Sequence, residues 1–216
     1  MSRIQPLTKS EVTKTVGGRL ERGEAALGAP VLPAGIQAHC PPILEASQAL
    51  GAAPGKSGTL PVRLRALVSL RVAQLIGSPF CMDAGGAVSR RAGASDEQIT
   101  HLASFRQSPL FGPDEAAALA LAEAMTATPA NVPDDVFQQA RARFSDVQLV
   151  ELAATAAMEN YRARFNRAFA IEAQGLYRPN VERSEPVDGG YDTVMEASME
   201  SFPASDAPAW NATSIG

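Results

Sequence analysis

Hydrophobic residues recur along this chain every three or four positions, which is the spacing that gives an α-helix one apolar face. Between residues 61 and 76, apolar side chains stand at positions 64, 67, 68, 72 and 75. Gly77-Ser78-Pro79 interrupts this pattern, and because proline suits the first turn of a helix, we expect a second helix from about Phe80 to Ala92. No alternating β-branched run is long enough to indicate a strand. The pattern therefore predicts an all-α fold whose central helix pair is kinked.

Capping residues, prolines and glycines mark the ends of the other helices that we expect. These helices cover residues 8–27, 42–51, 113–126 and 145–174, and shorter ones begin at residues 95 and 133. Residues 28–41 are rich in proline and glycine and are predicted to form a loop. From residue 176 onward, proline, serine and acidic residues dominate. We therefore divide the chain into one helical domain, residues 1–176, and an irregular C-terminal tail, residues 177–216, which is either mobile or wraps a neighbouring subunit.

Composition and charge narrow the classes of partner. With 19 basic residues against 23 acidic ones, the net charge is −4, which does not favour nucleic acid binding. The N-terminus has no apolar signal region and no stretch approaches about eighteen uncharged apolar residues, so we expect a cytoplasmic protein without a membrane partner. Cys40 and Cys81 are too few for a disulfide framework, and with His39 and His101 they form no metal-binding pattern. We expect reduced thiols and no metal.

The stretch from Leu64 to Arg91, LRALVSLRVAQLIGSPFCMDAGGAVSRR, resembles the core motif of the carboxymuconolactone decarboxylase and alkylhydroperoxidase-D-like family. Peroxidase members of that family carry the pattern Glu-x11-Cys-x2-Cys-x3-His. On this chain the four positions of the pattern are Ala66, Ser78, Cys81 and Gly85. The second cysteine of the pattern is kept, while the glutamate, the first cysteine and the histidine are replaced. The resemblance thus implies the fold of the family without its peroxidase relay.

This resemblance covers roughly residues 4–176. The loop that starts at His39, HCPPIL, is similar to a His-x-Pro turn of the family, and residues 144–171 resemble its long helix. Members of the family are helical trimers or hexamers with the site at the kinked helix. They include lactone decarboxylases that need no cofactor and thiol peroxidases that reduce hydroperoxides. The resemblance implies a homo-oligomeric helical bundle that acts on a small molecule without a cofactor.

Cys81 is the first candidate catalytic residue, because it is the position of the peroxidase motif that this chain keeps. It lies in the first turn of the expected helix after Pro79, where unpaired N–H groups and the helix dipole favour a thiolate. Asp83 either interacts with the same helix dipole or takes part in catalysis. Ser78 either caps the helix or contributes to substrate binding. His39 is a candidate acid or base because of its place in the loop that resembles the family's.

Isolated polar residues on apolar helix faces supply the remaining candidates. Glu151 is flanked by apolar residues, so its carboxyl group must be paired or protonated. We expect it either to form a structural ion pair with Arg71 or Arg164, or to act as a catalytic acid or base. Arg71, within LVSLRVAQL, either pairs a buried acid or holds a substrate carboxylate. Asn160 and Arg164 stand one turn apart on a common face, and they either form structural contacts or bind the substrate.

These observations favour an enzyme of the carboxymuconolactone decarboxylase type that needs no cofactor. We expect it to act as a lyase, isomerase or hydrolase on a small anionic acid or lactone, by proton transfer at an activated carbon. The first alternative is a one-cysteine alkylhydroperoxide reductase that uses Cys81, whose sulfenic acid an outside thiol would resolve. The second alternative is a binding or assembly module without catalysis, in which the acidic tail contacts a partner.

Overall fold

The structure, a computed structural model, describes residues 2–179 of the chain. Over these residues it contains α-helices and one 3₁₀ helix and no β-strand, which confirms the prediction of an all-α fold. The α-helices in chain order are α1 (Lys14–Leu27), α2 (Leu32–Gln37), α3 (Pro41–Ser57), α4 (Val62–Ile76), α5 (Pro79–Arg91), α6 (Asp96–His101), α7 (Pro113–Thr126), α8 (Asp134–Arg141) and α9 (Asp146–Ala168). The 3₁₀ helix η1 (Leu102–Gln107) follows α6.

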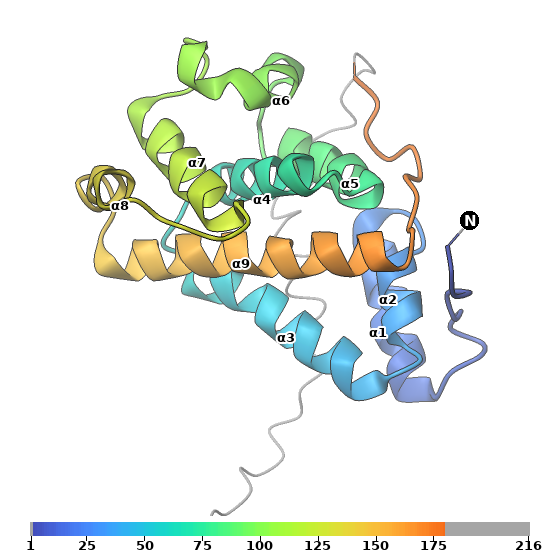
Figure 1. Cartoon of the computed structure of the whole chain (residues 1–216). Helices are drawn as coiled ribbons and strands as arrows, with labels where there is room; N and C mark the ends of the chain where they lie inside the picture. The colour runs from blue at the N-terminus through green and yellow to red at the C-terminus, as the bar shows by residue number, and fades with distance from the viewer. Residues whose placement is uncertain (1, 180–216) are drawn as a thin grey trace, which may run out of the picture.

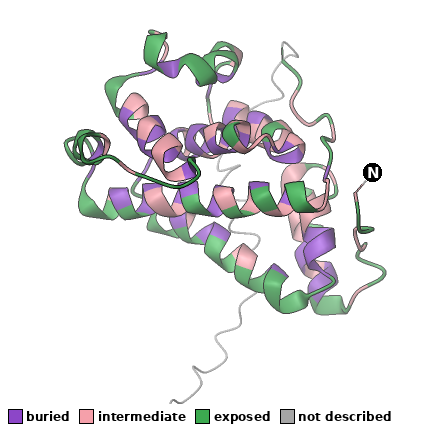
Figure 2. Cartoon of the chain, in the orientation of Figure 1, coloured by how far each residue is buried: buried purple, intermediate pink, exposed green. Residues whose placement is uncertain are grey.

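Helix α4 lies at the centre of the fold and packs against α5, α7 and α9. The long helix α9 crosses the molecule, with α4, α5 and α7 on one side of it and α3 on the other (Figure 1). Buried residues therefore concentrate on α4 and on the facing stripe of α9 (Figure 2). Leu67, Val68 and Leu152 are fully buried there, and burying a side chain of this size contributes about 1.5–3 kcal/mol.

The predicted kink between the two central helices is confirmed. Gly77 ends α4 with a positive φ of 70°, a conformation that glycine adopts without steric cost. Ser78 caps α5, and its hydroxyl group accepts a hydrogen bond from the backbone N–H of Cys81 at 3.5 Å. Pro79 is the first residue of α5. Cys81 thus lies in the first turn of α5, as the sequence predicts. Of the apolar positions predicted on α4, Leu75 alone is exposed. It lies in the last turn of α4, on a side of the helix that no other described residue covers.

Three helices in the N-terminal part differ from the prediction. One half of the capping box predicted at Thr8 forms, since Glu11 accepts a hydrogen bond from the Thr8 N–H at 2.8 Å, but it closes a turn rather than a helix. Helix α1 begins at Lys14 instead, with Thr13 as its cap. Helix α3 continues past Gly51 and ends only before Gly58, and α2 lies within the segment predicted as a loop.

The end of α9 also differs, because the helix stops at Ala168 rather than at residue 174. Ala170 has a positive φ of 51°, and the chain then turns back towards α5. Tyr177, predicted to belong to the tail, packs against α5, where its ring leaves no room for a side chain at Gly86. The rest of the predicted tail, residues 180–216, lies outside the described residues, so the division of the chain at residue 176 stays a prediction.

Within residues 2–179, no helix has the length and apolar character needed to span a lipid bilayer.

Candidate functional site

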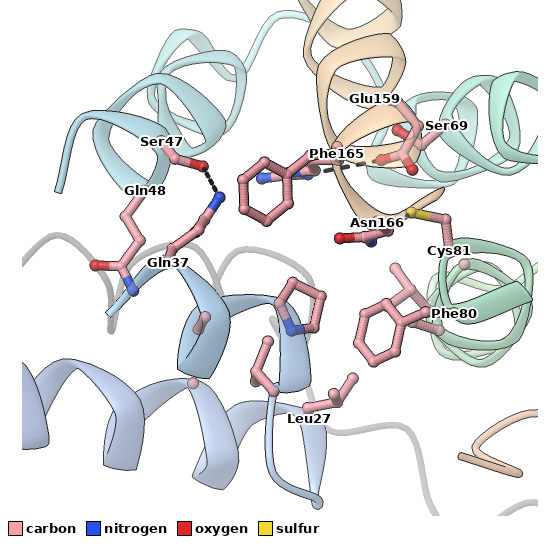
Figure 3. A pocket seen from close by; sticks show the side chains of 18 of the residues that line it. Leu27, Gln37, Ser47, Gln48, Ser69, Phe80, Cys81, Glu159, Phe165 and Asn166 are labelled. Atoms are coloured by element: carbon pink, nitrogen blue, oxygen red, sulfur yellow. Dashed lines mark hydrogen bonds and ion pairs between the residues drawn. The ribbon is translucent and has the colours of Figure 1, made fainter. Parts of the chain in front are cut away.

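A cavity of about 240 Å³ opens between the N-terminal helices α1 to α3 and the helices α4, α5 and α9. Much of its wall is apolar, with Leu27, Phe80 and Phe165 among the side chains that border it (Figure 3). Its polar lining on the side of α4, α5 and α9 consists of Ser69, Cys81, Glu159, Arg162 and Asn166. An apolar cavity with a few converging polar groups is the usual form of a small-molecule site.

Cys81 is buried in the wall of this cavity, with 7% of its surface exposed. Its sulfur accepts a hydrogen bond from the side-chain amide of Asn166 at 3.2 Å, and the Glu159 carboxyl group is its second side-chain neighbour. Burial raises the pKa of Cys81 strongly, and the carboxyl group of Glu159 raises this pKa further. The hydrogen bonds of Ser78 and Asn166 act in the opposite direction but are outweighed. Burial and Glu159 thus oppose the effect of the helix N-terminus, which by itself would favour a thiolate at Cys81.

Glu159 is a buried carboxyl group, with 6% of its surface exposed. Burial raises the pKa of Glu159, while the charge of Arg162 and the hydrogen bond with Cys81 act to lower it. The Arg162 guanidinium lies 3.8 Å from the Glu159 carboxylate, which is a long contact for an ion pair. Cys81 and Glu159 thus form a pair of titratable groups that the fold holds away from water.

The spacing of residues along α9 explains why two polar side chains reach this cavity. Leu152, Ala156, Glu159, Ala163 and Asn166 follow one another at intervals of four, three, four and three residues, and all five are buried. This is the spacing of one buried helix face. Glu159 and Asn166 therefore continue the apolar stripe of α9. The sequence analysis missed Glu159, Arg162 and Ser69 as site residues, although this spacing indicates that Glu159 is buried.

The two relay positions that the chain has lost also border the cavity. Ala66 and Gly85, which stand where peroxidases of the resembling family carry glutamate and histidine, both line it. Alanine and glycine are shorter than glutamate and histidine, so these two positions leave space in the cavity that Cys81 also lines. Position 85 has limited room for change, because a Cβ atom on Gly85 would lie 3.2 Å from a methyl carbon of Leu70.

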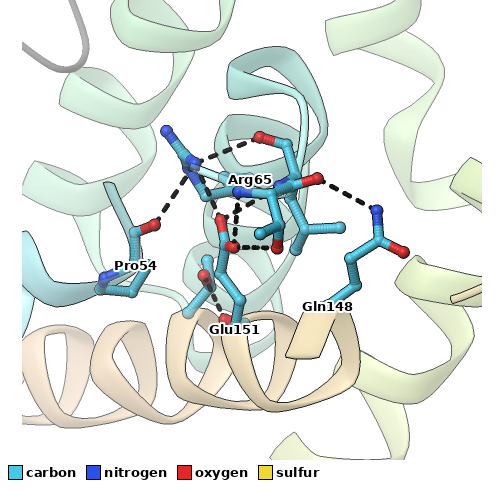
Figure 4. A network of polar contacts seen from close by, with 7 residues as sticks. Pro54, Arg65, Gln148 and Glu151 are labelled. Atoms are coloured by element: carbon cyan, nitrogen blue, oxygen red, sulfur yellow. Dashed lines mark hydrogen bonds and ion pairs between the residues drawn. The ribbon is translucent and has the colours of Figure 1, made fainter. Parts of the chain in front are cut away.

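Glu151 lies elsewhere, in a separate polar cluster between α4 and α9 (Figure 4). The carboxylate accepts a hydrogen bond from the Arg65 guanidinium at 2.9 Å, and both side chains are 1% exposed. It also accepts hydrogen bonds from the N–H of Thr59 at 3.0 Å and from the N–H of Leu60 at 3.3 Å. Glu151 is thus buried and ion-paired as predicted, but its partner is Arg65 and not Arg71 or Arg164.

The arginines predicted to hold a substrate anion do not border the cavity. The Arg71 guanidinium donates to the Glu123 carboxylate at 2.6 Å. Arg164 donates to the side-chain oxygen of Asn160, whose amide donates to the Thr126 hydroxyl group at 2.9 Å. The structure gives each of these side chains a partner within the protein.

The remaining predicted residues have structural contacts too. The exposed ring of His39 lies 2.9 Å from the backbone oxygen of Gln5. The Asp83 carboxylate accepts hydrogen bonds from the backbone N–H groups of Gln174 at 2.7 Å and Tyr177 at 2.8 Å. Asp83 therefore anchors the segment after α9 to α5. Of the predicted site residues, Cys81 borders the cavity, and the roles proposed for the others stay predictions.

Among residues 2–179, no group of His, Cys, Asp and Glu side chains is arranged to hold a metal ion.

Comparison with known proteins yields one family model, described as the carboxymuconolactone decarboxylase family, which matches residues 41–124. The uncharacterized protein YnjA of Escherichia coli (strain K12) is 43% identical over 122 residues, which are 56% of this chain and 66% of YnjA. The uncharacterized protein YdfG of Bacillus subtilis (strain 168) is 33% identical over 89 residues, which are 41% of this chain and 60% of YdfG. The chain thus spans just under two thirds of the length of these relatives.

Two solved structures extend the comparison over more of the chain. The debrominase Bmp8 has a TM-score of 0.74 at 18% identity, and the match covers 90% of this chain and 97% of Bmp8. The Agrobacterium tumefaciens protein ATU0492, a protein of unknown function ascribed to the AhpD antioxidant group, has a TM-score of 0.61 at 29% identity. That match covers 64% of this chain and 94% of ATU0492. The likeness to Bmp8 concerns the fold.

Proposed function

We propose that this chain, which belongs to the carboxymuconolactone decarboxylase family, is an enzyme that transfers a proton at an activated carbon of a small organic acid or lactone. The observation that carries the proposal is the buried contact between the Cys81 thiol and the Glu159 carboxyl group beside an apolar cavity. The catalytic pair is thus Glu159 with Cys81, in place of the His39 and Glu151 expected from the sequence.

The environment of the pair suits acid–base chemistry. A carboxyl group with a raised pKa exchanges its proton closer to neutral pH, where a general acid or base is most effective. A thiol with a raised pKa keeps its proton and can donate it. Both groups lie where water is largely excluded, so the charge that develops on a substrate interacts strongly with its surroundings.

The reaction then needs only a substrate with a carbonyl group that accepts an electron pair. In an isomerisation of an acid or lactone with a β,γ double bond, the Glu159 carboxylate takes a proton from the carbon beside the carbonyl group, and the electron pair of the C–H bond forms a dienolate. The Cys81 thiol protonates the γ carbon of that dienolate, which moves the double bond beside the carbonyl group, and Glu159 returns its proton to the sulfur. In a decarboxylation, the electrons of the C–C bond form the enolate as carbon dioxide leaves, and one of the two groups protonates the carbon.

Arg162 is the residue that we expect to hold an anionic substrate. Its guanidinium borders the cavity on the same face of α9 as Glu159, one turn further along the helix. The contact with Glu159, at 3.8 Å, is long enough to leave donors for a second carboxylate. Arg162 takes over the role that the sequence analysis gave to Arg71 and Arg164.

The one-cysteine hydroperoxide reductase is the second candidate, and one observation favours it. Glu159 lies where it could accept the proton of the Cys81 thiol and so prepare a nucleophile. The raised pKa of Cys81 counts against it, since the thiolate is the reactive species. Ser78 occupies the position of the resolving cysteine, so the oxidised sulfur would need an outside thiol.

Deuterium exchange tests the proposal without knowledge of the complete reaction. The protein would be incubated in D₂O with 2-oxobutanoate and with γ-butyrolactone carboxylates, and loss of the proton signal beside the carbonyl group would be followed by NMR. We expect exchange above the buffer rate in the wild type, a loss of at least about a hundredfold in Glu159→Gln, and wild-type rates in the exposed control Glu21→Gln. Exchange at the buffer rate with every probe, together with rapid oxidation of Cys81 by cumene hydroperoxide, would favour the peroxidase instead.

A further inference from the structure

Asn166 has one side-chain atom that finds no hydrogen-bond partner among residues 2–179. The residue is 2% exposed and lies in the cavity wall. Its side-chain nitrogen donates to the Cys81 sulfur at 3.2 Å, whereas its side-chain oxygen, Oδ1, is buried without a hydrogen bond. Buried polar atoms in native proteins nearly always have a partner, because an unpaired acceptor loses the hydrogen bonds that water would give it. The Oδ1 atom of Asn166 therefore marks a place where something outside the described chain donates.

The contact of the Asn166 side-chain nitrogen determines where the side-chain oxygen lies. Because the nitrogen is held by the sulfur, the oxygen lies on the opposite side of the group, pointing away from Cys81 and into the cavity (Figure 3). The rings of Phe80 and Phe165 border the same space, and neither ring carries a hydrogen-bond donor. The site thus combines largely apolar walls with an unpaired acceptor beside the reactive pair.

We propose that Asn166 Oδ1 is the acceptor for an O–H or N–H group of the ligand, and that the site selects compact apolar rings or enols that carry such a donor. That these ligands are also substrates rests on the proposed function. On that basis, the donor group of the substrate lies beside the carbon at which Cys81 and Glu159 transfer protons. The hydroxyl group of an enol or of a hydroxylated ring has this position. Asn166 then has two tasks, since one half of its amide holds the thiol and the other half orients the ligand.

A site built to accept a hydrogen bond rejects an analogue that lacks the donor, because the buried acceptor is then left unpaired. Phenol and fluorobenzene provide a matched pair of probes, since both are single rings of nearly the same size and phenol alone has a donor. In an apolar cavity without a free acceptor, the less polar fluorobenzene binds more tightly. The unpaired oxygen of Asn166 should reverse this order.

Isothermal titration calorimetry of the full chain with the two probes gives the test. We expect phenol to bind the wild type at least about tenfold more tightly than fluorobenzene, and the preference to disappear or reverse in Asn166→Leu. Gln37→Leu, in the same cavity, is the matched control and should keep the preference for phenol. Should Asn166→Leu fail to fold, the side-chain amide signal of Asn166 in the wild type should shift on addition of phenol and stay in place with fluorobenzene.

Three results would overturn the inference. They are binding of neither probe, equal or tighter binding of fluorobenzene by the wild type, and a preference for phenol that survives in Asn166→Leu. In the last case another acceptor, such as Glu159, would be the partner of the ligand. Because these measurements need no turnover, their outcome is independent of the deuterium exchange experiment. A positive exchange result with no preference for phenol would leave the proposed function standing and remove the role of Asn166.

Discussion

Replacing Arg65 with methionine removes the guanidinium that pairs with Glu151 between α4 and α9. The two side chains lie 2.9 Å apart and are each 1% exposed, so water cannot take the place of the lost partner. Methionine fills much of the same volume with a flexible apolar chain, which keeps the effect of a cavity small. The substitution therefore leaves a buried carboxylate without its cation, and it also removes the hydrogen bonds that Arg65 donates to the backbone oxygens of Pro54 and Leu60.

Removing one partner of a buried ion pair costs about 3–5 kcal/mol, which is a large share of the 5–15 kcal/mol that stabilises a typical domain. The N–H groups of Thr59 and Leu60 still donate to Glu151 in the variant, so we expect the lower end, about 3 kcal/mol. The double variant Arg65→Met/Glu151→Leu should regain only part of this loss, because it removes the unpaired carboxylate but leaves the N–H groups of Thr59 and Leu60 without their acceptor. Lys9→Met is the control, since its ion pair with Glu21 is exposed and should contribute less than about 1 kcal/mol.

The effect should depend on pH in a defined direction. Burial raises the pKa of Glu151, but hydrogen bonds from Thr59 and Arg65 outweigh it, and the pKa lies below its usual value. A carboxyl group with a lowered pKa contributes stability above its unfolded pKa of about 4.3, and this contribution is lost as the pH falls through the folded pKa. The difference between wild type and Arg65→Met should thus be largest near neutral pH and shrink in acid.

Urea denaturation followed by circular dichroism at several pH values measures this difference, from the midpoints and the slopes. The reasoning is refuted if Arg65→Met loses less than about 1 kcal/mol near neutral pH, as an exposed pair would. It is also refuted if the loss is the same at every pH, since a contribution from an ionised Glu151 must fade in acid.

Three further predictions follow from contacts around α5. Glu159→Gln should speed the alkylation of Cys81, measured by peptide mass spectrometry, because the carboxyl group helps to raise the pKa of that thiol; an unchanged rate would contradict the contact. Asp83→Ala should destabilise the fold by about 1.5–3 kcal/mol and expose the segment after α9 to limited proteolysis, since two backbone N–H groups lose a charged acceptor; resistance equal to the wild type would count against the anchor. Gly86→Ala should cost about 1–3 kcal/mol in urea denaturation, because the new Cβ would lie 2.7 Å from the ring of Tyr177; a neutral effect would mean that Tyr177 moves freely.

Local signals in the sequence were sufficient to predict most helices of the fold. The capping box at Ser95, the proline at position 113 and the glycine at position 77 each act within one helical turn, so they can be recognised without tertiary structure. The prediction was wrong where packing decides the outcome. Helix α3 continues through Gly51, and α9 ends early because Asp83 on α5 binds the segment that follows.

The site was harder to predict, because its members come from helices that are distant in sequence. The partner of Glu151 could not be chosen from the sequence, since Arg65 and Arg71 both lie on α4 and only the packing against α9 decides between them. The environment of Cys81 was also hard to predict, because the helix N-terminus acts locally, whereas the carboxyl group of Glu159 that opposes it comes from α9. Helical periodicity places Glu159 on a buried face, but not beside a sulfur.

The two buried glutamates of α9 differ in how fully the protein compensates their charge. Glu151 accepts hydrogen bonds from Thr59, Leu60 and Arg65, so its charge is fully compensated and a ligand would have nothing to bind. Glu159, two turns along the same helix, has a distant arginine, a thiol and an open cavity beside it. A buried polar group whose charge or hydrogen bonds are not fully matched lowers the stability of the protein. Such groups are typical of sites where a bound molecule supplies the missing partner. The unpaired oxygen of Asn166, on the same face of α9, is what such a site would contain before its ligand binds.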